Sequence, residues 1–128
     1  MGVKLNGERA KEYIGYKIFA INDKQLRTPF VYYPIERQMT EQEIITAPNY
    51  RHMRISFYSS HHVGHWSFFC RLKDVYLDIQ KHHYFYSFPL IILKCKFYDV
   101  KFGKWMDLEY QCGLARKMKI LDVIGTVY

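Results

Sequence analysis

The stretch LIILKCKFYDV, residues Leu90 to Val100, contains the pattern that decides the fold. Every second residue from Ile91 to Phe97 is apolar, and the lysines Lys94 and Lys96 stand between them. Because successive side chains of a β-strand point to opposite faces of a sheet, this alternation predicts a strand with one buried face and one exposed, lysine-bearing face. The longest apolar run, residues 88–93 (FPLIIL), overlaps the start of this stretch. It is much shorter than the roughly 18 residues of a membrane span, so we expect no membrane contact.

Three further segments show the same alternation or a similar apolar pattern. Residues 53–59 (MRISFYS) predict a half-buried strand, and residues 105–112 (WMDLEYQC) predict another after a turn at residues 102–104. Residues 118–128 (MKILDVIGTVY) are the predicted last strand. A run of strands of this kind favours a largely antiparallel sheet.

One strong helix is predicted before the C-terminal strands. Apolar residues recur at i, i+3, i+6, i+7 and i+10 from Phe69 to Ile79, which is the stripe of an amphipathic helix. The predicted helix covers about residues 67–80, with Ser67 as its N-cap. Its apolar stripe is expected to pack on the sheet.

Two shorter helices are predicted in the N-terminal half. Residues 7–14 lie between a capping Asn6 and Gly15, and residues 41–46 follow the capping-box pattern of Thr40 to Glu43. Together these elements favour a single α+β domain over residues 1–128, with a twisted, mainly antiparallel sheet and one main amphipathic helix.

The composition is that of a basic, aromatic-rich protein. Hydrophobic residues make up 49% and aromatic residues 18% of the chain, which excludes disorder as its main state. The net charge is +7, of which residues 1–50 carry +1 and residues 51–128 carry +6. Three widely spaced cysteines and an N-terminus without a signal-peptide core favour reduced thiols and a cytoplasmic location.

The lysine-bearing side of the predicted C-terminal sheet is the main candidate binding surface. Lysine and arginine neutralise phosphates, and tyrosines stack on bases, in proteins that hold single-stranded nucleic acid. The same lysines also suit an acidic protein surface, or serve only to protect a sheet edge from aggregation. The candidate binding residues are Lys94, Lys96, Tyr98, Lys101, Lys104, Arg116, Lys117, Lys119, Tyr84 and Tyr86. The C-terminal VIGTVY is a candidate edge strand that pairs with a partner or with a second copy of the chain.

The histidine-rich segment YSSHHVGHWSFFC, residues 58–70, suggests two alternatives. His61, His65 and Cys70 have spacings found in zinc sites, although Gly64 interrupts any helix and solvated loop histidines are the simpler interpretation. A Cys70 thiol in the first turn of a helix, near His65, would be acidified for nucleophilic chemistry, but its neighbours are apolar. We therefore expect no resident metal or cofactor.

Three segments resemble small domains of unknown function that phages and viruses encode. They are residues 15–19 (GYKIF), residues 64–68 (GHWSF) with the following Leu72, Asp74 and Val75, and residues 116–124. In such domains a GYKVF-like strand opens the chain and a Gly-His or Gly-aromatic turn precedes a helix. The resemblance implies an accessory factor of the host cytoplasm, similar to anti-CRISPR proteins, that docks onto a host-defence protein or nucleoprotein complex and blocks it.

The segment 64–68 is also similar to the second strand and helix of NAD-dependent ADP-ribosyltransferases. That resemblance implies a nucleotide pocket at the His65 turn and a catalytic acid on a late strand, for which Glu109 and Asp122 are the candidates. The implied reactive set is Tyr16, His65 and Glu109. Neither acid lies in a Glu-x-Glu or Gln-x-Glu pair. We therefore favour a binding protein, with a nucleotide-using transferase as the alternative.

Overall fold

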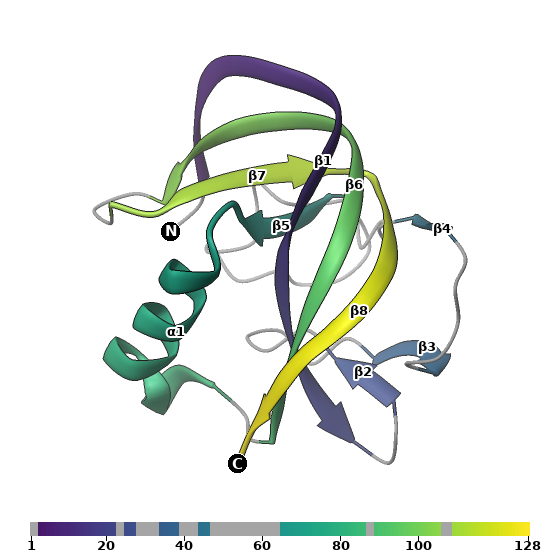
Figure 1. Ribbon diagram of the computed structural model, residues 1–128, viewed down its shortest axis with the longest axis vertical. Coiled ribbons are helices and arrows are strands. Elements are labelled where there is room, and N and C mark those ends of the chain that lie inside the picture. Colours follow the sequence, from purple (N-terminus) through teal and green to yellow (C-terminus); the bar gives the residue numbers. More distant parts are fainter. Residues whose placement is uncertain are drawn as a thin grey trace, which may run out of the picture.

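Two long, bent strands form the spine of the molecule (Figure 1). The computed structural model describes residues 3–22, 25–27, 34–38, 44–46, 65–86, 89–105 and 109–128. Its elements are, in chain order, β1 (Val3–Asn22), β2 (Gln25–Arg27), β3 (Pro34–Gln38), β4 (Ile44–Thr46), β5 (Trp66–Phe69), α1 (Leu72–Lys81), the 3-10 helix η2 (His83–Phe85), β6 (Leu90–Trp105), β7 (Gln111–Ala115) and β8 (Lys117–Val127).

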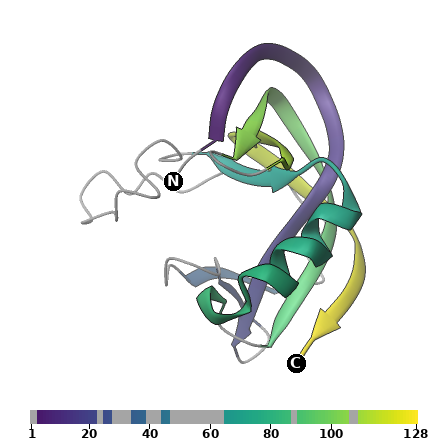
Figure 2. The ribbon, with the colours of Figure 1, turned by 90° about the vertical axis from the view of Figure 1, so that its left-hand side faces the viewer.

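All described strand pairs are antiparallel, and they form one sheet in the order β3-β2-β1-β5-β7-β6-β8-β4. β1 also pairs with β6, from Val3 opposite Trp105 to Ala20 opposite Leu90. The strands β1, β5, β7 and β6 therefore close into a ring, and Figure 2 shows β1 and β6 curling over to make it. The predicted fold class, a single α+β domain with a twisted, mainly antiparallel sheet and one main helix, is confirmed.

β6 changes its partner on one edge at Asp99. Before this residue Tyr98 lies opposite Lys117 of β8, and after it Lys101 lies opposite Leu114 of β7. Asp99 has a φ of 53°, in the left-handed region that aspartate tolerates better than most residues. The sheet therefore bends at this point without a change of register, and the predicted turn at residues 102–104 is wrong because β6 continues to Trp105.

The ring of strands is filled by the aromatic ring of Phe68. It stacks on Phe97 with 3.9 Å between ring centroids and an interplanar angle of 11°. A Cβ atom added to Gly15 would come within 2.6 Å of the Phe68 ring, and one added to Gly113 within 2.4 Å. Glycine at these two positions is therefore what lets β1 and β7 close around β5.

A second core lies under α1. Val75 and Ile79 of the helix are buried in one cluster with Leu90 and Ile92 of β6. The opposite side of β6, with Leu93 among its residues, belongs to the cluster around Phe68. The first four residues of β6, Leu90 to Leu93, are thus buried on both faces, and the predicted one-sided burial holds only from Lys94 onward.

The helix predicted over residues 7–14 is wrong, because these residues belong to β1. Asn6 does bond a nearby amide, since its Oδ1 accepts from the Glu8 N–H at 2.8 Å. This bond forms at an irregularity in the β1–β6 pairing, where Gly7 has a φ of +87°. An eight-residue helix without an apolar stripe is marginal on its own, whereas pairing with β6 satisfies the backbone along most of β1.

The main helix is confirmed, but it begins at Leu72 instead of near residue 67. Ser67 is not its N-cap, because it lies in β5, where Trp66 and Phe68 are buried by pairing with β7. The helix predicted over 41–46 is also wrong within the described residues, since Ile44–Thr46 is the strand β4. The strand predicted over 53–59 lies outside the described residues.

We expect Gly113→Ala to lower the free energy of unfolding by about 1–3 kcal/mol, because the added methyl overpacks the Phe68 ring. Gly125→Ala is the matched control, since its nearest atom would be the Tyr76 hydroxyl at 3.8 Å, and it should be close to neutral. Urea denaturation measures both. A second test is Phe68→Leu, which should make the added Gly113→Ala substitution less costly; equal costs in both backgrounds would contradict the packing account.

Candidate docking face

Lys94 and Lys96 of β6 lie on the part of its face that α1 leaves uncovered. α1 covers Leu90 and Ile92, and beyond them the same face carries Lys94, Lys96 and Tyr98. Residues directly opposite in antiparallel strands share a face, so the register names their neighbours. We define the docking face by the three rows that this register sets side by side: Tyr16–Lys94–Asp122, Ile14–Lys96–Lys119–Ile44 and Glu12–Tyr98–Lys117.

Among the described residues, the charges on this face are only partly compensated. Lys96 makes an ion pair with Glu12 at 3.0 Å, and the hydrogen bond to Glu12 raises the pKa of this lysine. Lys96 also lies directly opposite Lys119, a like-charged pair that costs sheet stability. Four lysines thus share the face with two carboxylates, and the excess positive charge is concentrated on β8 at Lys117 and Lys119.

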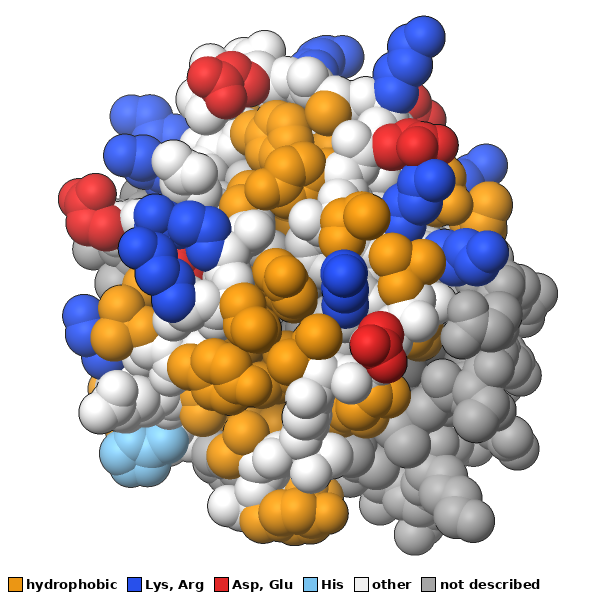
Figure 3. All heavy atoms as spheres, viewed as in Figure 1, with side chains coloured by type: hydrophobic (Ala, Val, Ile, Leu, Met, Phe, Trp, Pro, Cys, Tyr) orange, Lys and Arg blue, Asp and Glu red, His pale blue; other side chains and the backbone are white. Residues whose placement is uncertain are grey.

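Exposed aliphatic side chains flank the lysines. Ile14 is 48% exposed and Ile44 is 51% exposed, at the two ends of the row that contains Lys96 and Lys119. Figure 3 shows hydrophobic side chains running down the middle of this side of the molecule, with most lysines and arginines toward its margins. The surface is therefore amphipathic and is not a continuous cationic plate.

Five of the ten predicted binding residues lie together on this face, namely Lys94, Lys96, Tyr98, Lys117 and Lys119. Arg116 adjoins them in the bend between β7 and β8 and is exposed. The other four lie elsewhere: Lys101 and Lys104 beyond the Asp99 bend, Tyr84 in η2, and Tyr86 after η2.

Tyr86 is buried, so the prediction that it forms part of a binding surface is wrong. Its hydroxyl donates to the Oδ2 atom of Asp78, whose Oδ1 atom lies 3.0 Å from Nδ1 of His82. Burial and the neighbouring Asp78 carboxylate raise the pKa of Tyr86 well above its ordinary value. The side chain ties the segment after α1 to the helix.

The candidate metal ligands His65 and Cys70 do not meet in the described residues. β5 separates His65 from Cys70, and five residues of extended strand span about 16 Å. Cys70 is not in the first turn of a helix, and burial raises the pKa of its thiol instead of lowering it. His61 lies outside the described residues, among which no group of three metal-ligating side chains occurs.

The residues of the transferase alternative are also dispersed. His65 lies before β5, whereas Glu109 lies near its other end, where the carbonyl oxygen of Glu109 accepts from Arg71. Tyr16 and Asp122 flank Lys94 on the docking face. Within the described part of the chain, Tyr16, His65 and Glu109 therefore form no common site.

Sequence reasoning missed the β1 side of the docking face. Glu12, Ile14 and Tyr16 alternate with the inward-facing Tyr13 and Gly15, but a helix was predicted over most of this segment. The alternation was readable as a strand only with the knowledge that β6 lies beside it.

A buried amine lies beneath β5. Lys17 is 8% exposed, and its Nζ atom donates to the Ser67 carbonyl oxygen at 2.6 Å and to Ser67 Oγ at 3.4 Å. The amine lies 5.6 Å from the ring centroid of Phe19 and 6.0 Å from that of Trp66. Burial lowers the pKa of Lys17 to about 8, and no carboxylate among the described residues pairs with the amine.

No protein-family model, curated protein or solved structure matches the chain. Among the residues that the structure describes, no helix is long and apolar enough to cross a membrane.

We expect Lys17 to make stability depend on pH. Its pKa is about 8 when folded and near 10.5 when unfolded, so the unfolded chain binds more protons between these values and stability from this group rises with pH. Lys17→Met removes that contribution. The free energy of unfolding of the variant minus that of the parent should therefore be greatest near pH 7 and should fall from pH 8 to pH 10. Guanidinium titrations across this range measure it, and a difference that does not vary with pH would rule out a buried, titrating amine.

Proposed function

We propose that the protein acts by binding an acidic protein partner through the docking face. The single observation that carries this proposal is the row Ile14–Lys96–Lys119–Ile44, in which exposed aliphatic side chains flank a pair of lysines. Protein interfaces combine an apolar centre with polar and charged groups around it, and complementary charge steers the partner. Exposed apolar side chains gathered on one face are the usual mark of such a site.

A protein partner fits this face better than single-stranded nucleic acid does. Base stacking needs open aromatic faces, but Lys96 already lies over the Tyr98 ring, 5.8 Å from its centroid. Tyr86 is buried and Tyr84 lies in η2, away from the β6 lysines. Exposed aliphatic side chains such as Ile14 and Ile44 offer little to a phosphate backbone, whereas they suit the apolar groups of a protein surface.

The accessory role implied by the phage-like segments is part of this proposal. A small domain that presents charged and apolar groups on one face is sufficient to cover a partner's surface and block it. The free edge of β8 supports dimerisation less well. Within the described residues, β4 covers the outer edge of β8 only at Lys117–Lys119. The rest of β8 shifts register twice against β6, and a strand with such irregularities is a poor template for another strand.

The test compares two charge reversals of equal size. Lys96→Glu with Lys119→Glu should weaken capture of a specific partner from a nuclease-treated host lysate by at least about tenfold, because it reverses the charge that steers docking. Lys73→Glu with Lys81→Glu changes the net charge equally on α1 and should leave capture unchanged. Quantitative pull-down of the partner measures both effects.

Ile14→Ser separates a protein partner from nucleic acid. We expect it to reduce capture without reducing the weak, salt-sensitive binding of a single-stranded oligonucleotide measured by fluorescence anisotropy. Capture that disappears on nuclease treatment, or oligonucleotide binding that follows the Lys96 and Lys119 substitutions while Ile14→Ser is silent, would replace the protein partner with nucleic acid.

A further inference from the structure

Asn6 and Gly7 of β1 form a pair of neighbours with a chemistry of its own. Of the three asparagines in the chain, only Asn6 is followed by glycine. The side chain of an asparagine can be attacked at its Cγ atom by the main-chain nitrogen of the next residue. Glycine obstructs this attack least because it has no side chain. The pair belongs neither to the docking face nor to the enclosure of Phe68, so it is a separate feature of the molecule.

The pair lies where the β1–β6 ladder is interrupted. Leu5 is opposite Gly103 and Arg9 is opposite Lys101, and the register shifts between these two pairs. Residues 6–8 of β1 therefore stand opposite Phe102 alone, and all three of them are exposed. The main chain is not held in a regular ladder at this point, which leaves it the freedom that a ring closure needs.

The local geometry favours attack on the Asn6 side chain. Gly7 has a φ of +87°, and a Cβ atom built on it would have no other atom within 4 Å. The Glu8 N–H donates to Asn6 Oδ1 at 2.8 Å, which folds the side chain back along the main chain of Gly7. When Cγ is attacked, negative charge develops on this Oδ1 atom, and the same N–H stabilises it as the donor of an oxyanion hole does. One hydrogen bond thus both orients and activates the carboxamide.

We propose that Asn6–Gly7 is a site of spontaneous deamidation in the folded protein, with isoaspartate as its main product. The Gly7 nitrogen gives its proton to a solvent base and forms a bond to Asn6 Cγ, and the side-chain nitrogen leaves as ammonia. Water then opens the resulting succinimide ring. Cleavage between the Gly7 nitrogen and the main-chain carbonyl carbon of Asn6 gives isoaspartate, whereas cleavage between this nitrogen and Cγ gives aspartate. Water is the only co-reactant.

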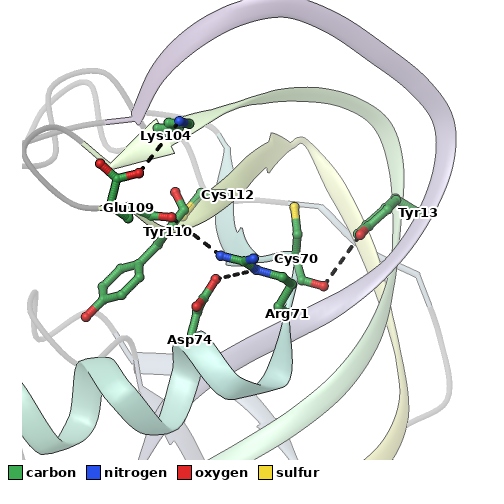
Figure 4. A network of polar contacts seen from close by, with 8 residues as sticks. All are labelled: Tyr13, Cys70, Arg71, Asp74, Lys104, Glu109, Tyr110 and Cys112. Carbon is green, nitrogen blue, oxygen red and sulfur yellow. Dashed lines mark hydrogen bonds and ion pairs between the residues drawn. The ribbon is translucent and has the colours of Figure 1, made fainter.

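The modification adds a negative charge where cationic residues lie close together. Both products carry a carboxylate in place of the carboxamide, so the net charge of +7 falls by one unit. Lys4 lies opposite Lys104 on one side of the interruption, and Arg9 lies opposite Lys101 on the other. Glu109 is 3.9 Å from Lys104 and already offsets part of this charge (Figure 4). The new carboxylate is added between the two cationic pairs, which lowers its electrostatic cost.

Isoaspartate also adds one carbon atom to the main chain of β1. Within a regular ladder such an addition would disturb the register of the strand beyond it. At Asn6 it falls in the interruption between Leu5 and Arg9, so we expect the pairs from Arg9 onward to be retained. The enclosure of Phe68 and the docking face depend on those later pairs, and the modified protein should therefore stay folded.

Peptide mapping of the full chain after incubation at neutral and at mildly alkaline pH tests this proposal. Trypsin releases residues 5–9 (LNGER) as one peptide, in which mass spectrometry detects deamidation and chromatography separates isoaspartate from aspartate. The deamidated peptide should accumulate faster at the higher pH, because the attacking nitrogen must lose its proton, and isoaspartate should exceed aspartate. Residues 18–24 (IFAINDK), in which Asp23 follows Asn22, are the internal control and should stay intact.

The same measurement on protein unfolded in urea shows whether the fold leaves the site open. Folded and unfolded chains should deamidate at comparable rates. An Asn6 that stays intact in the folded protein while the unfolded chain deamidates would overturn the proposal. The modified fraction, separated by cation exchange, should melt at the temperature of the parent. A modified fraction that is unfolded would also overturn it, because Asn6 would then lie within the pairing that holds β1.

Two variants assign the chemistry to this pair of residues. Asn6→Gln keeps a carboxamide but would have to close a larger ring, so the modification of peptide 5–9 should be lost. Gly7→Ala places a methyl group beside the attacking nitrogen and should remove most of it. The methyl also sits at a positive φ, which costs about 1–2 kcal/mol, so folding of this variant is checked by its melting curve. Deamidation of the peptide that continues unchanged in folded Gly7→Ala would exclude attack by the Gly7 nitrogen.

Discussion

The contact on which the rest of the structure depends is the enclosure of the Phe68 ring by two glycines. Gly15 on β1 and Gly113 on β7 lie so close to the ring that neither can carry a side chain, and Phe97 of β6 stacks on it at 3.9 Å. One residue thus touches three strands that are far apart in sequence. The short β5 pairs with β1 only at Tyr16 opposite Phe69. Where the two strands separate, the Lys17 amine donates a hydrogen bond to the carbonyl oxygen of Ser67.

The surface chemistry follows from how little of the sheet one helix can cover. α1 has 10 residues, and its buried side chains Val75 and Ile79 pack in one cluster with Leu90 and Ile92 at the start of β6. From Lys94 onward the same side of β6 has no helix over it among the described residues, and lysines replace the aliphatic side chains there. The change from Ile92 to Lys94 along one strand therefore separates core from docking face.

Patterns within one element were predictable from the sequence, whereas pairings between distant elements were not. The alternation from Ile91 to Phe97 correctly predicted the face of the sheet on which Lys94 and Lys96 lie. The final strand was predicted within one residue of each end of β8. β1 was misassigned over residues 7–14 because local capping signals resemble those of a helix when the partner strand, about 90 residues later, is unknown. Tyr86 was misplaced for a similar reason, since its burial depends on Asp78 in the helix.

The long β1–β6 pairing also has a consequence for biosynthesis. Val3 pairs with Trp105, so the N-terminal strand leaves the ribosome long before the strand that completes its hydrogen bonds. Contacts of such large sequence separation slow folding, and an unpaired strand is prone to aggregate while it waits. The charged residues Lys4, Glu8, Arg9, Lys11 and Glu12 along the first half of β1 keep the nascent chain hydrated during that interval. The β1–β6 pairing therefore forms only after β6 has been synthesised.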